Sequence, residues 1–261
     1  MLSQRSITHL VLAVSLAPIV TACLFGSVHG QPVPFWDEWI EPIDNAIKTA
    51  DGTLTISDLL RQYNDSRPVL TNVLTVVSVQ LFDWDLKAEM YFNLFLATIT
   101  LSLLCLVMRR HAGRAALFIL PLLSLLVFSL TQRRSLLWAI QSQYHFLILF
   151  LVAALWALDR PSSRWGSLWI AATCSIFATF SFANGFLVWF CLAPVCWMLG
   201  YRRRRHLIFW LVAATAGLSL FFTGYSFHAP GGGQLPGPFT AGKFALAYIG
   251  NALFGHNGPA T

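Results

Sequence analysis

The chain has 261 residues, of which 56% are hydrophobic and only 11% are charged, and its formal net charge is +6. A soluble domain usually has about 25% charged residues, and 17 basic plus 11 acidic side chains are too few to cover a water-exposed surface of this size. The composition excludes a soluble enzyme and a disordered chain, and five cysteines that lie mostly within apolar runs exclude a disulfide scaffold. We expect an all-α polytopic membrane protein.

Seven apolar runs approach the roughly 20 residues that cross a bilayer. They lie at 8–29, 89–108, 115–131, 143–158, 166–182, 184–200 and 207–226. A glycine- and proline-rich segment at 231–242 predicts a flexible outer loop, and the short apolar piece at 243–254 could begin an eighth span. We therefore expect one membrane domain over residues 1–261 with about seven transmembrane helices.

The first apolar run also has features of a signal sequence, because Arg5 precedes it and residues 20–23 resemble a lipoprotein cleavage box. A mature lipoprotein usually continues with a polar tether, whereas Leu24 and Phe25 continue the apolar run. The sequence favours a membrane span.

Charge is unevenly distributed along the chain. Residues 37–89 contain ten of the eleven acids and four basic residues, a net charge of −6, so the rest of the chain carries +12. Arginine-rich connections near 109–114, 160–164 and 202–205 alternate with arginine-poor ones between the predicted spans. The positive-inside rule then predicts a cytoplasmic amino terminus and an extracytoplasmic 30–88 loop, and it explains the basic balance without a nucleic-acid partner.

The 30–88 loop contains signals for two short helices. Thr55 and Asp58 form a capping-box pattern that predicts a helix with an apolar face from Ile56 to Tyr63. Pro68 predicts the start of a second helix that runs over 69–82 and is too short to span a bilayer. We expect both helices at the outer membrane interface.

The strongest chemical signal is a pair of adjacent carboxylates between aromatic rings directly after the first span. Asp37 and Glu38 lie within the run Pro-Phe-Trp-Asp-Glu-Trp at 34–39. A carboxylate there could act as a general base or help hold a divalent cation, while the rings offer a stacking face for a sugar. The alternative is an interfacial tryptophan belt with solvated acids.

An acidic pair and an aromatic on the first loop after an amino-terminal span, followed by short helices and many spans, resembles the GT-C superfamily of integral-membrane glycosyltransferases, and most closely its bacterial polyprenyl-phosphate-sugar-dependent members. The likeness covers about residues 1–108. It implies that Asp37 is the catalytic base or metal contact, with Glu38 beside it, and that a lipid-linked sugar donor reacts with inversion at the extracytoplasmic face of the bacterial inner membrane. Family members usually have more spans, so the resemblance also allows a partial chain.

Further candidate residues follow from the expected topology. Arg133 and Arg134 lie in a predicted outer connection, against the charge rule, and could neutralise a donor phosphate or anchor the helix end in lipid headgroups, with Arg67 as a weaker alternative. Gln141 and His145 share a helical face and could line the same cleft as Asp37 or join two helices.

Two acids before the second predicted span could also bind a metal. Asp83 and Asp85 have the spacing of a metal-binding pair, although acids at a helix start more often stabilise its positive end. With Asp37, they are weak candidates for a divalent cation.

Two other functions compete with glycosyl transfer. A transporter or lipid flippase needs acids inside the membrane, and the sequence predicts no buried acid in a span of the kind that relays ions. An accessory protein of cell-envelope polysaccharide assembly needs only a partner-binding loop. Because nearly all acids are predicted outside, the sequence favours extracytoplasmic chemistry or binding.

Overall fold

The computed structural model describes residues 3–160 and 163–226, together with positions 237, 239–240, 242–243 and 246. The chain divides into two units, Met1–Tyr225 and Ser226–Thr261, and the fold described below is that of the first. The expected outer loop at 231–242 and the candidate eighth span at 243–254 lie almost entirely outside the described residues.

The first unit is helical, and the described residues contain no strand beyond an isolated bridge between Tyr63 and Ser66. The expected all-α class is confirmed. In chain order the elements are α1 (Gln4–His29), η1 (Trp36–Trp39), α2 (Glu41–Ala50), α3 (Ile56–Leu59), α4 (Val69–Phe82), α5 (Leu86–Ala112), α6 (Ala115–Val127), η2 (Leu130–Gln132), α7 (Arg133–Leu137), η3 (Ala139–Gln141), α8 (Ser142–Leu158), α9 (Arg164–Thr179), η4 (Ala183–Phe186), α10 (Leu187–Met198) and α11 (Arg204–Phe222).

Within the described residues, five stretches are long and apolar enough to cross a membrane. They are Arg5–His29, Leu86–Ala112, Ala115–Leu137, Ala139–Leu158 and Arg204–Phe222. The two other expected runs form α9 and α10, which have 16 and 12 residues. Both are shorter than a fully formed span of about 20 residues, because the chain turns between them at Phe180 to Phe186.

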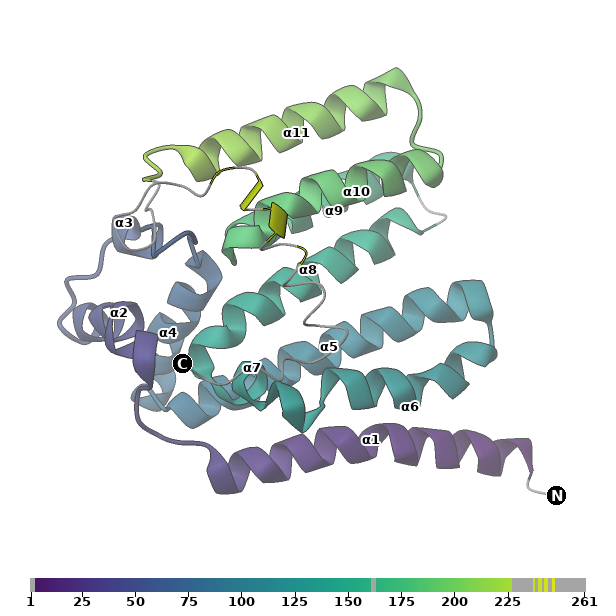
Figure 1. Cartoon of the computed structure of the whole chain (residues 1–261), viewed down its shortest axis with the longest axis horizontal. Helices are drawn as coiled ribbons and strands as arrows, with labels where there is room; N and C mark the ends of the chain where they lie inside the picture. Colours follow the sequence, from purple (N-terminus) through teal and green to yellow (C-terminus); the bar gives the residue numbers. More distant parts are fainter. Residues whose placement is uncertain are drawn as a thin grey trace. The chain divides into compact units, whose positions relative to one another are not determined.

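The long helices lie side by side in Figure 1, in the order α1, α6, α5, α8, α9 and α11 across the bundle. One apolar core joins α1, α5 and α6 around Ala22, Leu101 and Phe128, and a second joins α8 to α11 around Trp189 and Trp210. Many large apolar side chains point outward, such as those of α1 and α6. This pattern suits helices that face lipid.

Charged segments of the sequence lie at opposite ends of the bundle, as their elements can be followed in Figure 1. The arginine-rich turns α5–α6, α8–α9 and α10–α11 lie at the same end as the amino terminus, and we call this the basic end. The acidic segment with α2, α3 and α4 covers the opposite end, which we call the acidic end. This separation matches the expected alternation of connections.

The capping box at the start of α3 forms as expected. The Thr55 backbone N–H donates to Asp58 Oδ2 at 2.9 Å, and the Asp58 N–H donates to Thr55 Oγ1 at 3.4 Å. An ion pair then connects α3 to α2, since Lys48 Nζ lies 2.6 Å from Asp58. Lys48 Nζ also lies 2.9 Å from Asp44 within α2. The helix ends at Leu59, so the expected apolar face does not continue to Tyr63.

The polarity of α4 is reversed relative to a helix of a soluble protein. Its polar residues Thr71, Asn72, Thr75 and Ser78 are buried, while its apolar residues Val73, Val77, Leu81 and Phe82 are exposed. An apolar outer face and a polar inner face suit a short helix that contacts lipid on one side and a polar protein interior on the other.

Candidate functional site

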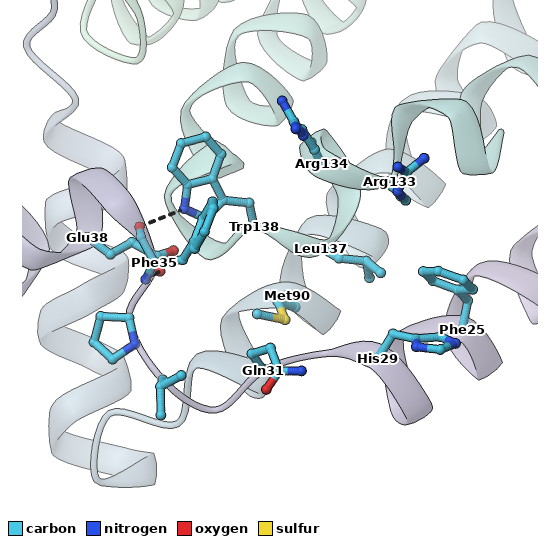
Figure 2. Close-up of a pocket in the computed structure, with 12 residues that line it drawn as sticks. Phe25, His29, Gln31, Phe35, Glu38, Met90, Arg133, Arg134, Leu137 and Trp138 are labelled. Atoms are coloured by element: carbon cyan, nitrogen blue, oxygen red, sulfur yellow. Dashed lines mark hydrogen bonds between the residues drawn. The ribbon is translucent and has the colours of Figure 1, made fainter.

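A cavity of about 380 Å³ lies at the acidic end, between the end of α1, the turn before η1, the start of α5, and α7. Its lining residues are Phe25, His29, Gln31, Val33, Pro34, Phe35, Glu38, Met90, Arg133, Arg134, Leu137 and Trp138. Figure 2 shows Glu38 and Phe35 on one side of this cavity and the two arginines on the other. Three residues expected from the sequence to serve one site therefore surround one space.

Aromatic rings form one wall of the cavity. The Phe35 ring stacks on Trp36 with 5.7 Å between centroids and meets Trp138 edge-on at 5.6 Å. The Trp138 indole N–H donates to the Phe35 carbonyl at 3.3 Å (Figure 2). Trp36 is 70% exposed and has a positive φ of 50°, a conformation that an aromatic residue rarely adopts. An exposed ring held in a strained backbone conformation is suited to stacking on a ligand.

The Glu38 carboxylate connects the two chain segments that form this wall. Its carboxylate is 1% exposed, and it accepts the Phe35 backbone N–H at 2.8 Å and the Ile140 backbone N–H at 3.1 Å, across 102 residues of sequence. Burial raises the pKa of Glu38, while these backbone hydrogen bonds act in the opposite direction. Both carboxylate oxygens are engaged, so we assign Glu38 the role of a positioning residue.

Replacing Glu38 with alanine should destabilise the acidic end. The change leaves two backbone N–H groups without their acceptor, at about 1–3 kcal/mol for each buried group. We expect the thermal midpoint of the purified protein to fall by several degrees, whereas Glu41→Ala, another buried acid of this segment without a backbone partner, should lower it less. Equal midpoints for Glu38→Ala and the unchanged protein would contradict this role.

Asp37 lies on the same turn but does not line the cavity. Asp37 is half-buried, and its carboxylate interacts with the Tyr63 hydroxyl. The pKa of Tyr63 is raised, first by burial and then by the negative charges of Asp37 and Glu41. Of the two adjacent carboxylates, Asp37 is the one not held by backbone N–H groups, and it is therefore the better candidate for proton transfer.

Arg133 and Arg134 begin α7 at the edge of the cavity, and both side chains are exposed. Neither takes part in any ion pair found among the described residues. Two guanidinium groups at the edge of one cavity can meet an anionic ligand there without first breaking an internal pair.

The structure separates three other candidates from this cavity. Arg67 donates to the backbone carbonyls of Leu60 and Thr223, at 3.1 and 2.5 Å, and lines a different cavity of about 240 Å³. The His145 Nε2 lies 2.9 Å from the Ser135 carbonyl, and Gln141 Oε1 is buried without a hydrogen-bond partner. Neither His145 nor Gln141 lines the cavity of Figure 2.

The candidate metal ligands do not come together. Asp83 ends α4 with a left-handed backbone at φ 51°, and Asp85 caps α5 by accepting the Lys87 N–H at 2.9 Å. Among the described residues, no three His, Cys, Asp or Glu side chains are grouped to hold a metal ion. We therefore derive no step through a divalent cation.

Sequence reasoning missed a polar interior next to the site. Glu41 and Asn45 of α2 are buried with no hydrogen-bond partner for their side-chain oxygens, and the nearest cation, Arg61 Nε, is 3.9 Å from Glu41. Glu89, in the first turn of α5, is 3% exposed within a candidate span, whereas the sequence grouped it with the acids of the 37–89 segment. The signal available was the polar spacing of α4 at Thr71, Thr75 and Ser78.

Burial of Glu41 gives the protein a pH dependence with a definite sign. Burial raises the pKa of Glu41 from 4.5 to about 7 although Arg61 acts against it. The folded protein therefore favours the protonated carboxyl of Glu41, so the contribution of this group to stability is fully present below about pH 4.5 and is lost as the pH rises through about 7.

Thermal midpoints measured between pH 5 and 8 should show this decline, and Glu41→Gln should reduce it. The burial of Glu38 acts in the same direction, so part of the slope should remain. A slope that is unchanged in Glu41→Gln would show that Glu41 does not cause it.

Comparison of the chain with protein-family models, with curated proteins and with solved structures found no match.

Proposed function

We propose that the protein is a glycosyltransferase of the GT-C type that transfers a sugar from a polyprenyl-phosphate donor at the extracytoplasmic face of a bacterial inner membrane. The observation that carries the proposal is the cavity at the acidic end, where Arg133 and Arg134 face an aromatic wall held by Glu38. Cations suit the donor phosphate and aromatic rings suit the sugar, and Asp37 lies next to Glu38 on the η1 turn, outside the lining of the cavity.

The reaction assigns one task to each group. Asp37 takes the proton of an acceptor hydroxyl, and the hydroxyl oxygen forms a bond to the anomeric carbon of the donor. The bond between that carbon and the phosphate oxygen breaks, and its electron pair stays on the phosphate. Arg133 and Arg134 meet the negative charge that develops there. Attack opposite the leaving phosphate inverts the anomeric carbon.

The direct test incubates the purified protein, in membranes or detergent, with polyprenyl-phosphate sugars and hydroxyl-bearing acceptors, and follows the release of polyprenyl phosphate. Release that depends on Asp37 supports the proposal. No release with any donor, from a protein that is folded by its thermal transition, would contradict it.

The orientation is tested separately. Ser57 is exposed in α3 within the acidic segment, and a cysteine introduced there should react with a membrane-impermeant maleimide added from outside. Cys191 is exposed and should first be replaced by serine to remove background labelling. Labelling of Ser57→Cys only from the cytoplasmic side would reverse the orientation and contradict the extracytoplasmic site.

One observation favours a second function, a non-enzymatic transporter or lipid flippase. Glu89 lines an otherwise largely apolar cavity of about 360 Å³ between α4 and α5, and its Oε1 has no hydrogen-bond partner. A buried acid beside apolar walls is a feature of transport pathways. If Glu89→Gln stops lipid movement while Asp37→Asn does not, the second function is correct.

A further inference from the structure

The arginines at the basic end differ in whether an acid neutralises them. In the α5–α6 turn and the α8–α9 connection, Arg110 and His111 pair with Asp159 at 3.4 and 3.0 Å. Arg160 lies over the Trp156 ring at 4.2 Å. Asp159 therefore supplies one counter-charge to this part of the basic end, to Arg110 and His111.

Within the part of the chain that the structure describes, no acid pairs with the arginines at the start of α11. Arg202, Arg203, Arg204 and Arg205 are consecutive and exposed, and the first turn of α11 contains no acid and no side-chain cap. The helix dipole adds positive charge at this point, and the first backbone N–H groups of a helix have no acceptor within it. Four cations at the positive end of a 19-residue helix repel one another unless an anion joins them.

The side chains of this region converge on a single buried residue. His206 is 2% exposed, and its Nδ1 has no hydrogen-bond partner among the described residues. The positive charges of Arg205, Arg203 and Arg164 influence its ring. Trp165 meets the His206 ring edge-on at 5.0 Å, and Arg205 lies over Trp165 at 5.7 Å. A buried ring nitrogen without a hydrogen-bond partner, under the influence of three positive charges, is an environment that a nearby anion would stabilise.

The turn before α11 holds part of this arrangement in place. Gly200 has a φ of 86°, a conformation that favours glycine, and its carbonyl accepts a hydrogen bond from Arg164. The Arg164 guanidinium lies over the Tyr201 ring at 5.8 Å, and the Tyr201 hydroxyl donates to the Leu158 carbonyl at 3.0 Å. The position of Arg164 beside α11 is therefore fixed by the backbone of the turn.

We propose that the start of α11, with Arg164, Arg203, Arg205 and His206, binds the phosphate group of an anionic phospholipid. The ligand is a lipid because α11 is a candidate membrane span whose exposed residues Leu207, Ile208 and Leu211 follow directly, so acyl chains can lie along the same helix. Clusters of basic residues at the end of a span attract anionic headgroups. This site lies away from the cavity of Figure 2 and does not depend on the glycosyltransferase proposal.

The test measures binding of short-chain phosphatidylglycerol to the purified full chain in detergent. Binding should weaken about twenty-five-fold in the double variant Arg203→Gln with Arg205→Gln, at about fivefold for each arginine removed. The matched control replaces Arg109 and Arg114 with Gln, because both are exposed at the same end and the charge change is equal. The control pair should bind within about threefold of the unchanged protein.

Several results would overturn the proposal. Equal weakening in both pairs would mean diffuse attraction, and unchanged binding in the Arg203 and Arg205 pair would place the lipid elsewhere. If phosphatidylcholine binds as tightly as phosphatidylglycerol, binding does not depend on the net charge of the headgroup. Inorganic phosphate that binds as tightly as the lipid and displaces it would identify a free anion as the ligand.

A second measurement uses the unchanged protein, in case the double variant does not fold. Phosphatidylglycerol with a photoreactive headgroup is crosslinked in vesicles, and the modified peptides are identified by mass spectrometry. Crosslinks concentrated within residues 199–210 support the site, while crosslinks at 109–114 alone, or none in this region, contradict it.

Discussion

Replacement of Asp37 with asparagine should reduce sugar transfer by at least a hundredfold while the protein remains inserted and folded. The amide keeps the size of the side chain but cannot accept a proton, and a positioned general base contributes about 10²–10⁴-fold to such a step. Asp37 has neither backbone partners nor an ion pair that the change would break among the described residues. The measurement is the rate of polyprenyl phosphate release at saturating donor.

The matched control is Asp51→Asn, an exposed acid at the end of α2 in the same segment. It makes the same change of charge at a position away from the η1 turn, and transfer should stay close to that of the unchanged protein. A thermal midpoint measured on each variant separates lost chemistry from lost structure. Full turnover by the Asp37→Asn protein would contradict the assignment of Asp37 as the base.

The elements that could be predicted from the sequence are those whose signals are local. The helix Val69–Phe82 and the capping box at Thr55 follow from residues a few positions apart. Helix α2 was not predicted from the sequence, because the burial of Glu41 is decided by contact with α4. A short sequence window contains no information on such a contact.

In the candidate site too, the sequence predicts general placement but not the features that depend on tertiary contacts. The prediction that Arg133 and Arg134 lie at the same end as the 30–88 segment agrees with the cavity that they line together with Glu38, because charge patterning and span counting are enough for that. The different roles of Asp37 and Glu38 could not be predicted. They depend on the Ile140 N–H, which reaches Glu38 from a segment 102 residues away. The tertiary structure places the adjacent residues Asp37 and Glu38 in different environments.

Replacement of both Arg133 and Arg134 with glutamine should weaken donor binding by about a hundredfold or more. A hydrogen bond to a charged group contributes about 1.5–3 kcal/mol, and about 1.4 kcal/mol corresponds to a factor of ten. Both arginines line the cavity and form no ion pair among the described residues, so the change breaks no internal contact of that kind. Donor titration of the purified variants measures the effect.

Replacing both Arg133 and Arg134 with lysine distinguishes phosphate binding from membrane anchoring. Lysine keeps the positive charge but loses the two-pronged geometry of arginine, so it should restore donor binding only in part if the arginines hold a phosphate. If they only anchor α7 in headgroups, lysine should substitute fully, and the glutamine pair should lower stability without changing donor affinity. Because the arginines lie across the cavity from the wall that Glu38 holds, as Figure 2 shows, an unchanged donor affinity in the glutamine pair would also remove the cavity as the donor site.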